Sequence, residues 1–81
     1  AAEAADWQAF GVFLHEQGYS KKLAFAALVH AETLFQDANL PTPSSLQLRT
    51  DLEHALGRDA AAIRRDPSPL LEQSLQLSPK N

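Results

Sequence analysis

The sequence predicts an all-α protein, a small bundle of four to five short helices. Apolar residues recur at the three- and four-residue intervals of a helix over most of the chain. Glycine, asparagine and proline separate these periodic stretches where helices commonly stop or start. No stretch alternates apolar with polar residues as a half-buried strand does, and β-branched residues are scarce. The helices are expected at about 6–17, 21–38, 43–56, 59–65 and 69–76.

Single residues mark the ends of the first three helices. We expect Asp6 to cap the start of the first helix. Gly18 is expected just past its end, because glycine takes the left-handed conformation without a steric penalty. Ser20 is the expected N-cap of the second helix. Asn39 is expected to end the second helix as Gly18 ends the first, and Gly57 to end the third.

In the second half of the chain, two predicted helices open at a hydroxyl residue followed by proline. Proline suits the first helical position, where its missing N–H removes no hydrogen bond. Thr42-Pro43 is therefore expected to open the third helix, and Ser68-Pro69 the fifth. Between them, Asp59 is the expected cap of a short fourth helix.

The chain has 81 residues, no cysteine and a formal net charge of −3. This length holds one domain, which we expect over 6–76, with a flexible lead over 1–5 and a flexible tail over 77–81. So small a core, with no disulfide, gives marginal stability to which a partner would add. No apolar run is long enough to cross a membrane and no signal peptide is evident, so we expect a cytoplasmic protein without a membrane partner.

The residue types that carry chemistry form no catalytic or metal-binding motif. The histidines lie on three separate predicted helices, without the spacing of a zinc site. No serine lies in a nucleophile-elbow sequence, and the three glycines are isolated, so no phosphate-binding loop is present. We expect no enzymatic activity, no cofactor and no small-molecule substrate. The histidines are His15, His30 and His54.

Residues 23–33 resemble the helix-turn-helix pattern of DNA-binding regulators. Small or apolar residues stand near the positions that this family fills with them, whereas Leu28 occupies the turn position that favours glycine. The resemblance implies a DNA-binding regulator centred on residues 21–38, and an uninterrupted helix is the simpler interpretation. Because acids outnumber bases, nucleic acid is an unlikely partner. DNA binding would require five bases to converge on one face: Lys21, Lys22, Arg58, Arg64 and Arg65.

A second, shorter pattern surrounds the predicted end of the first helix. Phe13-Leu14, Gly18-Tyr19 and Ala24 resemble the start of the LisH dimerisation motif, a short helical hairpin. The alanine falls one residue late for that motif. A glycine followed by a packed aromatic residue is also a common helix end. We therefore assign no family from this pattern.

The second predicted helix is apolar around more than half of its circumference, with Phe25 and Val29 on the side away from its leucines. Such a helix is either the buried centre of a bundle or has a face that binds a partner. We predict a non-catalytic interaction module, acting as a dimerisation, adaptor, chaperone or docking domain, that binds another protein or a second copy of itself. The expected contact residues are Phe13, Phe25, Val29, Leu70, Leu71 and Leu75.

Overall fold

The computed structural model describes residues 2–41 and 46–77. This part of the chain forms helices and no strand, so the all-α fold class is confirmed. The predicted opening of the third helix at Thr42-Pro43 lies outside the described residues. The helices are α1 (Ala2–Glu16), α2 (Lys21–Asp37), α3 (Leu46–Leu56), α4 (Arg58–Arg65) and α5 (Ser68–Leu75).

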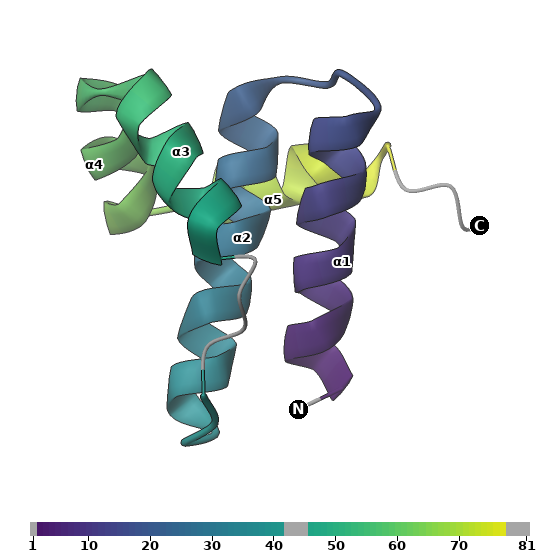
Figure 1. Ribbon diagram of the computed structural model, residues 1–81. Helices are drawn as coiled ribbons and strands as arrows, with labels where there is room; N and C mark the ends of the chain where they lie inside the picture. The colour runs from purple at the N-terminus through teal and green to yellow at the C-terminus, as the bar shows by residue number, and fades with distance from the viewer. Residues whose placement is uncertain (1, 42–45, 78–81) are drawn as a thin grey trace.

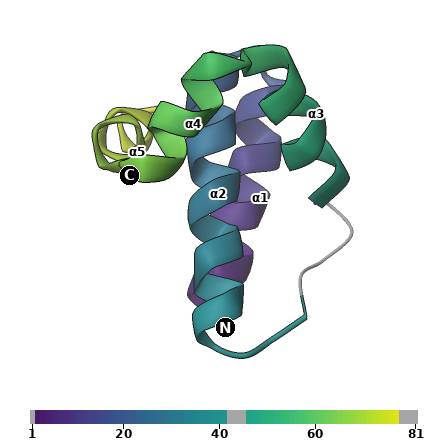
Figure 2. The ribbon, with the colours of Figure 1, turned by 90° about the vertical axis from the view of Figure 1, so that its left-hand side faces the viewer.

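The fold is built on an antiparallel hairpin of α1 and α2 (Figure 1). α3 and α4 lie on the side of α2 away from α1, and α5 crosses behind the hairpin and packs against α2. These three helices gather around the end of the hairpin where α1 turns into α2. No third helix lies beside the opposite end, where the chain begins and α2 finishes (Figures 1 and 2).

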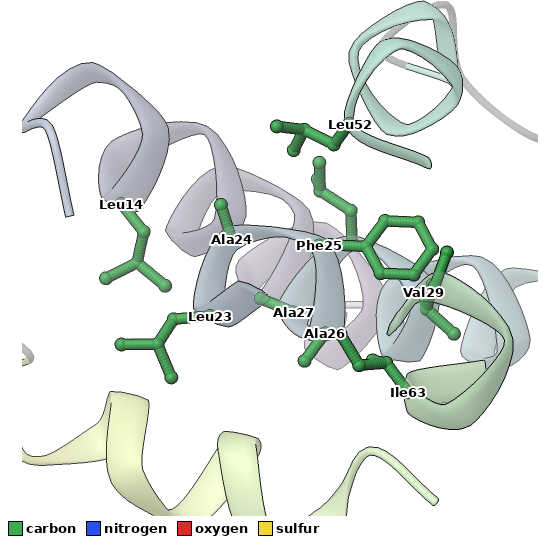
Figure 3. Packing of buried hydrophobic residues seen from close by; sticks show 11 residues of the cluster. Leu14, Leu23, Ala24, Phe25, Ala26, Ala27, Val29, Leu52 and Ile63 are labelled. Carbon is green, nitrogen blue, oxygen red and sulfur yellow. The ribbon is translucent and has the colours of Figure 1, made fainter. Parts of the chain in front are cut away.

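α2 is the centre of the bundle. Every residue from 23 to 29 is buried, because α1, α3, α4 and α5 all pack against this half of the helix. The alanines on α2 let the surrounding helices approach it closely. Leucines from α1 and α3 fill the space between these helices and α2 (Figure 3). Of the two interpretations of an over-apolar second helix, the structure shows the buried centre.

The predicted ends of α1 and α2 are confirmed. Gly18 and Asn39 follow these helices with positive φ angles of 79° and 62°. After Gly18, the N–H of Tyr19 donates to the carbonyl of Leu14 at 3.1 Å, which completes a Schellman motif, and the same arrangement follows Asn39. Ser20 caps α2, since its hydroxyl accepts a hydrogen bond from the N–H two residues later at 3.1 Å.

α1 begins at Ala2, earlier than predicted. Asp6 therefore lies inside the helix and does not cap it. Residues 2–5, expected as a flexible lead, form the first turn, and Ala4 is buried. Alanine is the strongest helix former, so the alanine-rich opening extends the helix as far as Ala4 can pack. At the other end, Leu77, expected in the tail, is half-buried against the core.

The starts of α4 and α5 also differ from the prediction. Gly57 ends α3 as expected, but its positive φ of 58° lets the next helix begin directly after it. Asp59 therefore lies within the first turn, where its carboxylate is 3.6 Å from Nζ of Lys22. In α5 the hydroxyl of Ser68 caps nothing. Instead, Asp66 accepts a hydrogen bond from the N–H of Ser68 at 3.2 Å.

Candidate functional site

Two of the expected contact residues belong to the core. The side chains of Phe25 and Val29 are only 0% and 5% exposed. Phe25 points into the space between Leu52 of α3 and Ile63 of α4 (Figure 3). α3 and α4 cover the side of α2 that carries Phe25 and Val29. These two residues therefore stabilise the fold and do not form a partner surface.

Four charged side chains form an ion cluster that links α3 and α4 to α2. Glu32 of α2, Arg49 and Glu53 of α3, and Arg64 of α4 form the cluster. Arg64 donates two hydrogen bonds to the Glu53 carboxylate, from Nε at 2.8 Å and from Nη2 at 3.1 Å. Arg49 also donates to Glu53, and its Nε is 3.3 Å from Oε1 of Glu32. The cluster thus joins three helices with two acids and two bases.

The electrostatics of the cluster favour the charged forms. The hydrogen bond from Arg64, with the positive charges of Arg64 and Arg49, lowers the pKa of Glu53 from 4.5 to about 2. The same hydrogen bond raises the pKa of Arg64 above its usual range. The Arg64 guanidinium carbon also lies 5.9 Å from the centroid of the Phe25 ring. Arg64 therefore helps to close the core above Phe25.

Four aromatic rings form a continuous aromatic strip along α1 and its C-terminal turn. Neighbouring ring centroids are 5.9, 6.1 and 6.3 Å apart, the range of favourable aromatic pairs. The three rings on α1 recur every third residue and are half-buried, whereas the ring of the last member is 40% exposed. Of these four residues only Phe13 was among the expected contacts. The aromatic strip consists of Trp7, Phe10, Phe13 and Tyr19.

The first ring of the strip also touches α2. The imidazole of His30 stands nearly perpendicular to the indole of Trp7, with 5.0 Å between ring centroids. His30 therefore packs against an aromatic ring, and His15 and His54 are exposed on other helices. Within residues 2–41 and 46–77, no three histidine or carboxylate side chains are placed to hold a metal ion.

The aromatic strip lies on a helix that packs mainly against α2. Among the described helices, α1 packs against α2 and makes no comparable contact with α3, α4 or α5. The rings are thus supported by one another and by α2 on one side, and on the other they are partly open to solvent. Partly exposed aromatic rings gathered in this way are typical of protein interaction surfaces.

The leucines of α5 divide between core and surface. Leu70 and Leu71 are half-buried against the core, and the fully buried residue of this helix is Ser74, whose hydroxyl donates to the carbonyl of Leu71 at 2.8 Å. Leu75 is 54% exposed, more than Tyr19 at 40%. Of the three expected contact residues on α5, Leu75 is therefore the accessible one.

The structure does not contain the turn that the helix-turn-helix pattern requires. α2 is continuous through Leu28, from Lys21 to Asp37. Two of the bases that DNA binding would need are paired with acids, Lys22 with Asp59 and Arg64 with Glu53. The simpler interpretation, one uninterrupted helix, is confirmed.

The described helices also include none with the length and apolarity required to cross a membrane. Comparison with known proteins adds no relative: no protein-family model, no curated protein and no solved structure matches this chain.

Proposed function

We propose that this chain is a non-catalytic protein–protein interaction module that binds its partner through the aromatic strip on α1. One observation carries the proposal. Four neighbouring rings, three of them partly buried and the fourth 40% exposed, lie along α1 and its C-terminal turn, and α1 packs mainly against α2. Leu75, exposed on α5, also remains a predicted contact residue.

The physical properties of the strip suit it to recognition. Tryptophan and tyrosine are enriched among the residues that dominate binding energy, because each adds a large contact area with few rotatable bonds. In the strip each ring already touches its neighbour, so binding orders it little further. A partner helix or loop that covers the rings therefore gains most of the apolar contact without a large entropic cost.

Site-specific photocrosslinking tests the proposal. A benzophenone-bearing phenylalanine analogue would replace Tyr19 in one version of the chain and Ala62 in another, both exposed in the structure. Ala62 lies on α4 and serves as the matched control. After irradiation in cells, we expect the version with the analogue at Tyr19 to crosslink a discrete protein that the Ala62 version does not.

A second measurement ties the crosslinked protein to the strip. With that protein purified, we expect Tyr19→Ser to weaken its binding by about fivefold or more, since loss of an interface aromatic commonly costs more than about 1 kcal/mol. Equal crosslinking at both positions, or binding that Tyr19→Ser leaves unchanged, would contradict the proposal.

A further inference from the structure

The lysines of the hairpin are confined to one of its ends. Residues 1–20 contain no lysine or arginine, and neither do residues 23–48. The two bases of the hairpin, Lys21 and Lys22, both lie where α1 turns into α2. The opposite end of the hairpin carries acids alone, among them Glu3 and Asp6 in the first turns of α1.

These two acids lie on the same side of α1 as the middle of the aromatic strip. Glu3, Asp6, Phe10 and Phe13 are spaced at three, four and three residues, which places them along one face of a helix. Both carboxylates are exposed, and no ion pair within residues 2–41 and 46–77 joins either of them to a base. The face is therefore apolar toward Phe13 and negatively charged toward Glu3.

The surroundings of this face leave room for a partner. The acids lie at the end of the hairpin beside which the structure places no third helix (Figures 1 and 2). From Glu3 to Phe13 the face is about 15 Å long, which corresponds to about three turns of a second helix. A segment of that length covers both the rings and the carboxylates.

We infer that the partner segment is a cationic amphipathic helix, an inference that rests on the proposed function of the strip. Its apolar residues pack on Phe10 and Phe13, and its lysine or arginine side chains reach Glu3 and Asp6. Opposite charges at the edge of an apolar contact raise the association rate, and the unpaired carboxylates repel acidic segments. The two features together select both the shape and the charge of the partner.

The charge pattern disfavours two other occupants. A second copy that used the same face would place acid against acid in a symmetric pair. Contact between this face and the basic end of another copy would be heterologous and would leave each complex open to further addition. An anionic lipid surface is repelled by the same carboxylates.

A peptide-binding experiment on the full chain tests the inference. The probe is a fluorescein-labelled peptide of leucine and lysine, about five helical turns long, with leucines on one helical face. One comparison peptide replaces every lysine by glutamate, and another has the same composition in scrambled order. We expect both comparison peptides to bind at least tenfold more weakly, as judged by fluorescence anisotropy.

Two charge-reversal variants localise the binding. Asp6→Lys changes the proposed face, and Asp51→Lys makes the same change at an exposed position of α3, on the other side of α2. We expect Asp6→Lys to weaken binding about tenfold and Asp51→Lys to change it less than twofold. Because exposed charges are screened, raising the ionic strength from about 0.05 to about 0.2 M is expected to narrow this difference.

Aromatic variants separate the inference from the proposed function. Phe13→Ala is used with thermal melting to show that it folds, and Tyr19→Ser supplies an exposed alternative. If these variants weaken binding of the peptide and Asp6→Lys does not, the strip binds without help from the acidic end, and the inference is overturned while the proposed function stands. If no variant changes peptide binding, the inference fails, and the crosslinking at Tyr19 decides the proposed function separately. Dimerisation in analytical ultracentrifugation that Asp6→Lys abolishes would overturn the inference in favour of a second copy.

Discussion

Leu28 of α2 packs directly on the backbone of α1 at Gly11. A Cβ atom at Gly11 would lie 2.7 Å from both Cγ and Cδ2 of Leu28, well inside van der Waals contact. Both residues are buried, so neither has free space into which it can move. The two helices approach as closely as they do because residue 11 has no side chain.

Gly11→Ala is therefore expected to destabilise the fold although alanine favours helices. Overpacking a core costs about 1–3 kcal/mol, against a helix-propensity gain of up to about 1 kcal/mol. Urea denaturation measures the net loss. In a Leu28→Ala background, of the three nearest atoms only the backbone nitrogen of residue 28, 3.3 Å away, still crowds the added methyl group, so Gly11→Ala should cost at least about 0.5 kcal/mol less there. An equal cost in both backgrounds would mean that Leu28 is not the obstacle.

The ion cluster makes stability depend on pH. Because the pKa of Glu53 is lowered from 4.5 to about 2 in the folded chain, its contribution is fully present above pH 4.5 and disappears as pH falls to about 2. Its carboxylate is 35% exposed, so solvent screening limits the contribution to about 1 kcal/mol. We expect urea unfolding to show wild type more stable than Glu53→Gln near neutral pH, with the difference vanishing near pH 2. Parallel pH profiles would refute this account.

Truncation of the buried Phe25 and of the exposed Leu75 should affect stability very differently. Truncation of a buried phenylalanine costs about 3–5 kcal/mol, most of the stability of a small domain. Phe25→Ala is therefore expected to leave the chain largely unfolded at room temperature in circular dichroism. Leu75→Ala, at an exposed position, should change the free energy of unfolding by less than about 0.5 kcal/mol. The reverse order would place Phe25 at the surface.

The two positive-φ helix ends should respond differently to the same substitutions. Alanine pays a steric penalty of about 1 kcal/mol in the left-handed region, which glycine does not. We expect Gly18→Ala and Asn39→Ala each to lower the melting temperature. Asn39→Gly should stay within about 0.5 kcal/mol of wild type, since relief of strain is offset by a more flexible unfolded chain. A stabilising Gly18→Ala would be inconsistent with the φ of 79°.

The helix ends at Gly18, Asn39 and Gly57 could be predicted because a positive φ at a glycine or asparagine is a property of one residue and its immediate neighbours. Helix starts were harder to predict, since several residues compete to accept the same backbone hydrogen bonds. Asp66 and Ser68 stand two residues apart, and only the local geometry decides that Asp66 accepts the bond.

The partner surface was predictable only in part. Helical spacing shows that α2 is apolar on most sides, but it does not show which helices cover those sides. For that reason Phe25 was expected to contact a partner. The contact of Trp7 with His30 joins residues from different helices. The same holds for Glu32 and Arg64, which meet in the ion cluster from α2 and α4. Such contacts depend on tertiary packing and leave no periodic signal in the sequence.

The hairpin of α1 and α2 is closed by only a few residues, from 17 to 20. Contacts between segments so close in sequence lose little chain entropy and form early in folding. α3 and α4 reach α2 through a longer stretch of chain, so we expect them to dock later. During synthesis, residues 1–40, which carry the whole aromatic strip and its acidic end, leave the ribosome before α3, α4 and α5 do. A partner that recognises this face would thus meet it on the nascent chain before α3, α4 and α5 have been made.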